Sequence, residues 1–155
     1  MDNEFYTVRG YELQQNQKKI TPAMEDYIEM IYRNSLNEGY IRINQLAQLL
    51  NVKNSSASKM VQKLGELGFL NYEKYGIITI TEQGKKLGGY LLKRHNIIEG
   101  FLKLLGCEEN VLRQTELIEH VIDNETVKNI AILNNFFKNE AILTKYKDFK
   151  NNNNP

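Results

Sequence analysis

The stretch NSSASKMVQKLGELGFLNYEKYGIITIT, residues 54–81, decides the fold. Its first half ends near Gly68 and places three apolar side chains on one face at helical spacing: Met60, Val61 and Leu64. Its second half holds two β-like runs with a glycine-containing turn between them: Phe69–Tyr72, Glu73–Gly76 and Ile77–Thr81. The pattern predicts a helix, capped by Ser55 or its neighbour, followed by a β-hairpin.

Two further helices are predicted upstream of this stretch. Thr21 at an N-cap and Pro22 at the first helical position begin one helix, and Gly39 ends it. Ile43–Leu50 forms a second, short amphipathic helix. Three helices and a hairpin in this order are typical of a winged helix-turn-helix domain.

The chain downstream of the hairpin is predicted to be entirely helical. The expected helices are Thr81–Leu105, Glu109–Val121, Glu125–Lys138 and Glu140–Phe149. Gly88 and Gly89 lie inside the first of them, and such a pair tolerates a close neighbour or a bend. The apolar stripes of these helices exceed what one short helical layer can bury, which predicts a homodimer.

The fold class is therefore mainly α, with an N-terminal winged helix-turn-helix followed by an all-helical dimerisation domain. The expected boundaries are a flexible N-terminal arm over 1–20, the winged-helix domain over 21–82, the helical domain over 83–150 and a disordered, low-complexity tail over 151–155.

The distribution of charge separates the two halves. The net charge of the whole chain is only +1. Residues 42–94 carry nine basic and three acidic side chains, a net +6, and residues 95–140 carry four basic and eight acidic ones, a net −4. A basic segment followed by an acidic one indicates that the first half binds a polyanion and the second has another task.

Cys107 is the only cysteine, so no intramolecular disulfide can form, which fits a reducing compartment. The N-terminus has no apolar signal core, and no apolar run approaches membrane-spanning length. We expect a soluble, cytoplasmic protein without a membrane partner.

The third helix sits where a recognition helix belongs. Short hydroxyls and N-terminal amides suit phosphate oxygens, glutamine can pair with base edges, and lysines neutralise phosphates. The candidate residues for contacting double-stranded DNA, including two at the hairpin tip, are Ser55, Ser56, Ser58, Lys59, Gln62, Lys63, Lys74 and Tyr75. Because this face has no arginine, we expect modest direct base readout and a large share from DNA shape and dimer spacing.

Carboxylates and histidines form three small clusters at helical spacing. They are Asp26 and Glu29 (i, i+3), His95 and Glu99 (i, i+4), and Glu116, Glu119 and His120 (i, i+3, i+4). Carboxylate pairs and a Glu-x-x-Glu-His step on converging helices are similar to the binuclear carboxylate sites built in bundles. Oxygen ligands with a minority of imidazoles and no thiolate favour Mn²⁺ or Fe²⁺ over Zn²⁺ or Cu⁺.

Several stretches together resemble the diphtheria toxin repressor family of metalloregulators, and within it the manganese transport regulator branch. They extend over about 21–138 and are Thr21–Glu29, Ser58–Leu64, Tyr72–Tyr75, Gly84–Lys86, Arg94–His95 and Ile118–His120.

The resemblance implies that six residues bind a pair of Mn²⁺ ions: Asp26, Glu29, His95, Glu116, Glu119 and His120. The iron-responsive branch has Met at the position of Asp26 and Cys at that of Glu116, so the harder oxygens here favour manganese, with Fe²⁺ and other divalent ions as alternatives. Glu99 lies outside the family's ligand set and is expected to orient His95. The iron branch has a third, SH3-like domain, which we do not expect in a chain of this length.

These features predict a manganese-activated repressor of metal-uptake genes that binds operator DNA as a homodimer, without enzymatic activity or a small-molecule substrate. Three alternatives remain: an iron-responsive repressor of the same family, a metal-independent winged-helix regulator, and a binuclear metal hydrolase. No motif for a substrate pocket or a water-activating group supports the hydrolase.

Overall fold

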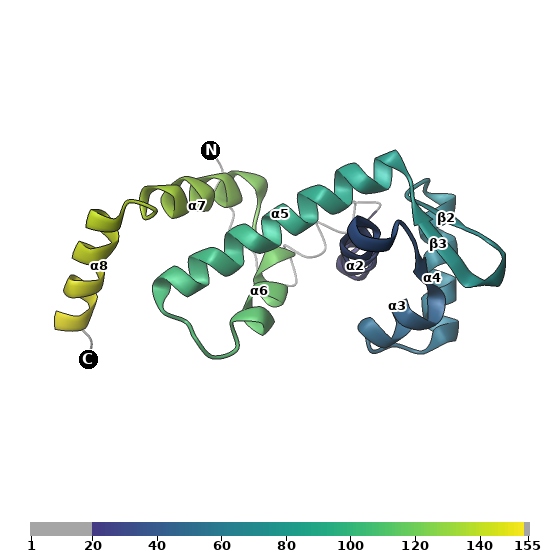
Figure 1. Cartoon of the computed structure of the whole chain (residues 1–155), viewed down its shortest axis with the longest axis horizontal. Coiled ribbons are helices and arrows are strands. Elements are labelled where there is room, and N and C mark those ends of the chain that lie inside the picture. Colours follow the sequence, from purple (N-terminus) through teal and green to yellow (C-terminus); the bar gives the residue numbers. More distant parts are fainter. Residues whose placement is uncertain (1–19, 154–155) are drawn as a thin grey trace, which may run out of the picture. The chain divides into compact units, whose positions relative to one another are not determined.

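In the computed structural model of the chain, residues 20–153 are described, and they fall into two units that divide between Gly89 and Tyr90 (Figure 1). The division lies inside helix α5 (Glu82–Leu105), rather than at the predicted boundary between 82 and 83. The predicted flexible arm, up to residue 19, lies outside the described residues. As predicted, the fold is mainly helical with a small sheet.

The first unit contains the three predicted helices and the hairpin. Its elements are α2 (Pro22–Glu38), β1 (Ile41–Arg42), α3 (Ile43–Leu49), α4 (Asn54–Glu66), β2 (Leu70–Tyr72), a 3-10 turn η1 (Lys74–Gly76) and β3 (Ile77–Ile80). The predicted start of α2 is confirmed, because the Thr21 hydroxyl accepts a hydrogen bond from the backbone NH of Met24 at 3.4 Å. Gly39 ends the helix in the left-handed conformation, with φ 76°.

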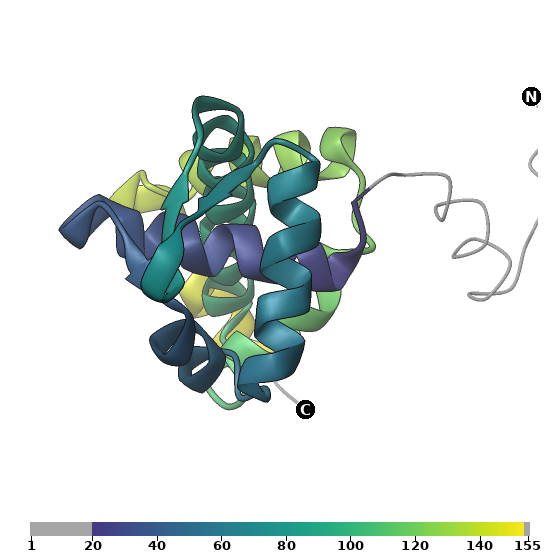
Figure 2. The same ribbon diagram turned by 90° about the vertical axis from the view of Figure 1, so that its right-hand side faces the viewer.

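The sheet has one strand more than the predicted hairpin. Its order is β1-β3-β2, and both pairs are antiparallel, with Ile41 opposite Ile78 and Leu70 opposite Ile80. β1 has only two residues, too few for an alternating pattern to show in the sequence. Figure 2 shows the hairpin beside α4, which packs against β2.

One apolar core joins the elements of the first unit. Side chains with at most 1% exposure come from every helix and from the sheet, and the largest are Met24, Ile28, Ile31, Ile41, Leu46, Val61, Leu64 and Ile78. Val61 and Leu64, on the face predicted for α4, belong to this core, whereas Met60 is half-buried.

Two glycines of α5 allow the helix to lie close to the rest of this unit. A Cβ at Gly84 would collide with the carbonyl oxygen of Phe69, and a Cβ at Gly88 would lie 2.5 Å from Cβ of Tyr32. The close neighbour expected at Gly88 and Gly89 is therefore the Tyr32 side chain.

Gly84→Ala is expected to lower the free energy of unfolding by about 2 kcal/mol. The backbone carbonyl of Phe69 cannot move aside, and the cost of this clash exceeds the helix propensity gained with alanine. Gly100→Ala in the same helix is the control. Its Cβ would meet only the Asn134 amide at 3.5 Å, an ordinary contact. We expect that variant to be up to about 1 kcal/mol more stable. Equilibrium urea unfolding measures both, and a stabilised Gly84→Ala variant would contradict the argument.

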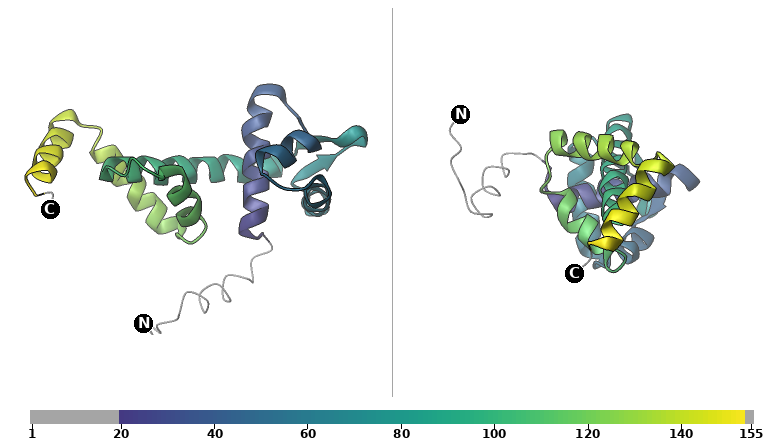
Figure 3. Two further views of the ribbon diagram at one scale, coloured as in Figure 1. Left: turned by 90° about the horizontal axis from the view of Figure 1, so that it is seen from below. Right: turned by 90° about the vertical axis from the view of Figure 1, so that its left-hand side faces the viewer.

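The second unit comprises the later part of α5 with α6 (Val111–Glu119), α7 (Asn124–Phe136) and α8 (Glu140–Asn152). Figure 3 shows the helices of this unit as ribbons. α6 and α7 both pack against α5 through a buried cluster of Ile98, Leu102, Val111 and Val127. Asp123 caps α7, and the hydrogen bond from the backbone NH of Thr126 lowers the pKa of its carboxyl below the ordinary value. α8 extends to Asn152, two residues into the tail that the sequence predicted as disordered.

The helices of the second unit leave large apolar side chains exposed. On α6 and α7 these are Leu112, Leu117, Ile132, Leu133 and Phe136, and α8 has no buried residue. The excess of apolar surface predicted for these helices is thus present in the fold. No helix within residues 20–153 has the length and apolar character needed to cross a membrane.

Candidate metal centre and nucleic-acid interface

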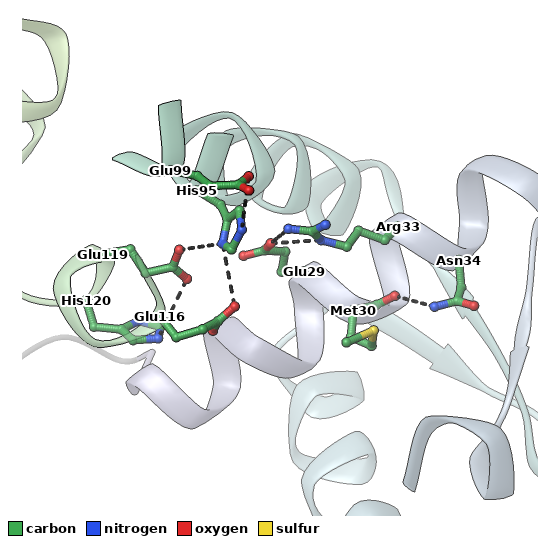
Figure 4. Close-up of polar contacts among 9 residues, drawn as sticks. All are labelled: Glu29, Met30, Arg33, Asn34, His95, Glu99, Glu116, Glu119 and His120. Atoms are coloured by element: carbon green, nitrogen blue, oxygen red, sulfur yellow. Dashed lines mark hydrogen bonds and ion pairs between the residues drawn. The ribbon is translucent and has the colours of Figure 1, made fainter. Parts of the chain in front are cut away.

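Two helices of the second unit bring four of the six predicted metal ligands together (Figure 4). α5 supplies His95, and α6 supplies Glu116 and Glu119, with His120 as its C-cap. Glu116, Glu119 and His120 each offer a ligand atom, and these atoms lie within 4.8 Å of one another. The packing of α6 against α5 also brings His95 to Glu119, 24 residues away in the sequence.

The centre of this cluster is a buried histidine–carboxylate pair. Nδ1 of His95 lies 2.8 Å from Oε2 of Glu119, and the two residues are 3% and 1% exposed. Nδ1 is also 3.6 Å from Oε1 of Glu116, and Oε1 of Glu119 is 3.8 Å from Nε2 of His120. Burying a carboxylate is costly unless positive charge or hydrogen bonds compensate it. Glu119 lies between both imidazoles, and because its carboxylate is buried, a cation bound there would be stabilised.

The donor set fits a hard divalent ion. The clustered atoms are carboxylate oxygens and imidazole nitrogens, which suit Mn²⁺ and Fe²⁺. The single thiol of the chain is not among them, because half-buried Cys107 packs against the apolar cluster around Ile98. That these residues bind a metal ion stays a prediction.

Glu99, expected to orient His95, lies 4.0 Å from Nε2 of that histidine, which is longer than a hydrogen bond. Its Oε1 is 2.5 Å from Nζ of Lys103, one turn further along α5. An orienting role for Glu99 stays a prediction.

Asp26 and Glu29 belong to the first unit and are i and i+3 on α2. Oε1 of Glu29 accepts hydrogen bonds from Nε and an Nη of Arg33, at 2.9 and 2.6 Å. Arg33 was not among the predicted site residues, although an acidic and a basic residue four apart on a helix indicate such a pair. That Asp26 and Glu29 complete the metal site stays a prediction.

Most of the predicted DNA-contacting residues are exposed. They are Ser55, Ser56, Lys59, Gln62 and Lys63 on α4 and Tyr75 at the wing tip, whereas Ser58 is half-buried. The side chain of Lys74 lies outside the described part of the chain.

The predicted cap on α4 is wrong, because Lys53 occupies the N-cap without a side-chain hydrogen bond. The amide of the neighbouring Asn54 donates a hydrogen bond to Oδ1 of Asn44.

Comparison with known families matches both units. Residues 19–78 match the N-terminal DNA binding domain of the iron dependent repressors, and residues 81–141 match their metal binding and dimerisation domain.

Several characterised proteins are similar to this chain along most of its length. The HTH-type transcriptional regulator MntR of Oceanobacillus iheyensis is 42% identical over 131 residues, which cover 84% of this chain and 88% of that protein. MntR of Geobacillus kaustophilus is also 42% identical, over 86% of this chain and 96% of its own.

Among solved structures, the manganese regulator SloR is 27% identical with a TM-score of 0.66, and the match covers 76% of this chain and 55% of that one. ScaR with bound Zn²⁺ is 29% identical with a TM-score of 0.60, and the match covers 71% of this chain and 52% of that one. The chain thus spans about half the length of these two solved structures. Because the family's two domain models account for most of its sequence, the chain belongs to the iron dependent repressor family.

Proposed function

We propose that this protein is a manganese-activated, DNA-binding transcriptional repressor that controls genes for metal-ion uptake. The observation that carries the proposal is the buried His95–Glu119 pair, flanked by Glu116 and His120. The names of its relatives support the metal and the role, since they include MntR regulators and a manganese regulator. These relatives are transcriptional regulators, so we propose no catalytic activity.

The proposed site holds two Mn²⁺ ions per subunit and uses all six predicted ligands. His95, Glu116, Glu119 and His120 come from the second unit, and Asp26 and Glu29 come from the first. Mn²⁺, when bound, supplies the positive charge that offsets the mutual repulsion of four carboxylates. Asp26 and Glu29 then hold the winged-helix unit in one orientation. Protonation of either imidazole competes with metal binding, so activation weakens as pH falls.

We further propose that two copies pair through exposed apolar side chains of the second unit, among them Ile132 and Phe136 of α7. Fixing the orientation of each winged-helix unit then fixes the spacing of the two α4 helices, which must match two half-sites about one DNA turn apart. Metal binding favours this conformation over others and shifts the population towards it. Because the proposed partner is chromosomal operator DNA, the proposed location is the cytoplasm.

Oxygen ligands at Asp26 and Glu116 favour manganese over the iron-responsive alternative, whose branch of the family has Met and Cys there. The test selects duplexes from a random library twice, once in Mn²⁺ and once in chelator, and measures affinity for the selected DNA in both buffers. We expect tight binding to a two-half-site duplex in Mn²⁺ and a loss of at least about 100-fold in chelator. Equal affinity in both buffers would support a metal-independent regulator instead.

A further inference from the structure

Helix α2 contains an ion pair that the proposed metal site does not explain. Two nitrogens of the Arg33 guanidinium converge on one oxygen of Glu29, Oε1, at 2.9 and 2.6 Å (Figure 4). Arg33 is the only basic residue of α2, so a single side chain supplies all of the helix's own positive charge.

We infer that Arg33 is a built-in counter-ion of Glu29 that competes with the divalent cation and so sets the metal concentration at which the protein responds. The inference rests on the proposed function, in which Glu29 is a metal ligand. The guanidinium occupies Oε1, one of the two oxygens through which Glu29 could bind a cation, and its own charge repels a cation nearby.

The two partners differ in how easily they can leave the pair. The Glu29 side chain is only 10% exposed, whereas that of Arg33 is 39% exposed. Glu29 therefore stays in place, while the Arg33 head can turn into water along its flexible stem when a cation takes its position. Without metal, Arg33 compensates the negative charge of Glu29. When metal binds, Arg33 releases and leaves that charge to the cation.

The first measurement is the dissociation constant for Mn²⁺, by titration calorimetry on the full chain without DNA. Arg33→Met removes the charge while keeping a long helix-forming side chain, and we expect Mn²⁺ to bind about tenfold more tightly, or better. Arg33→Lys keeps the positive charge but cannot make the two-nitrogen contact. Its Mn²⁺ dissociation constant should lie closer to that of the unchanged protein. Lys85→Met is the matched control, since it removes an exposed positive charge paired with Glu82 at 2.7 Å. It should leave the Mn²⁺ affinity unchanged.

Thermal unfolding supplies a second readout that a merely structural role would not produce. Without metal, Arg33→Met should melt roughly 2–4 °C lower, because Glu29 loses a compensating charge. In saturating Mn²⁺ the order should reverse or the difference vanish, because the variant gains more from the ion.

An Arg33→Met variant that binds Mn²⁺ with unchanged or weaker affinity would overturn the inference, and weaker binding would show Arg33 to be a positioning residue. Absence of Mn²⁺ binding in every variant would overturn the proposed function, and this inference with it. Binding by Arg33→Met alone would support the competition in its strongest form.

Discussion

Glu119→Gln is expected to weaken Mn²⁺ binding by at least about 100-fold and to abolish the metal-dependent gain in DNA affinity. Glu119 is the most buried of the proposed ligands, with 1% exposure. One of its oxygens lies 2.8 Å from Nδ1 of His95 and the other 3.8 Å from Nε2 of His120, so it lies between both imidazoles. The amide has the same shape but carries no charge, so the loss falls on cation binding rather than on packing.

The measurements are Mn²⁺ titration calorimetry and the Mn²⁺-induced rise in melting temperature. In the metal-free state, the melting temperature of Glu119→Gln should fall by at most a few degrees, because no cavity forms and a buried charge is removed. Its melting temperature should then stay constant as Mn²⁺ is added. Glu125→Gln, at an exposed position in the first turn of α7, is the control and should bind Mn²⁺ normally. Normal Mn²⁺ binding by Glu119→Gln would remove the central ligand from the proposed site.

The sequence predicted best those elements whose ends carry local signals. Thr21 and Pro22 begin α2 and Gly39 ends it, because caps and turns depend on residues within a few positions of one another. It failed at the start of α4, where Lys53 stands at the N-cap without a side-chain hydrogen bond instead of the predicted Ser55 or its neighbour. β1 was missed because its two residues become a strand only by pairing with β3.

The candidate site shows the same division between local and long-range information. Helical spacing placed Glu116 and Glu119 together on α6, three residues apart. Spacing could not show that Glu119 is buried while the side chain of Glu116 is 56% exposed. That difference arises from the packing of α6 on α5 through Ile98 and its neighbours, which also brings His95 to Glu119. Such contacts depend on which faces of two helices meet, and the spacing of residues within one helix does not show this.

Phe136→Asp is expected to convert the protein from dimer to monomer, with the dimer dissociation constant rising by roughly 10²–10³-fold. Phe136 is 56% exposed at the end of α7, and Ile132, one turn earlier on the same helix, is 66% exposed. Covering each such partly exposed side chain with a second copy contributes about 1–2 kcal/mol. In a symmetric pair one substitution changes both subunits, so two carboxylates would be desolvated at the interface.

Sedimentation velocity over a range of protein concentrations measures the change. Leu36→Asp is the matched control, because Leu36 is 61% exposed on α2, outside the proposed interface, and should leave the dimer intact. The Phe136→Asp monomer should still bind Mn²⁺, since its proposed ligands all come from one subunit. It should lose tight binding to a two-half-site duplex, because only a dimer engages both half-sites at once. A Phe136→Asp protein that remains dimeric at the same concentrations would place the interface elsewhere than on this face of α7.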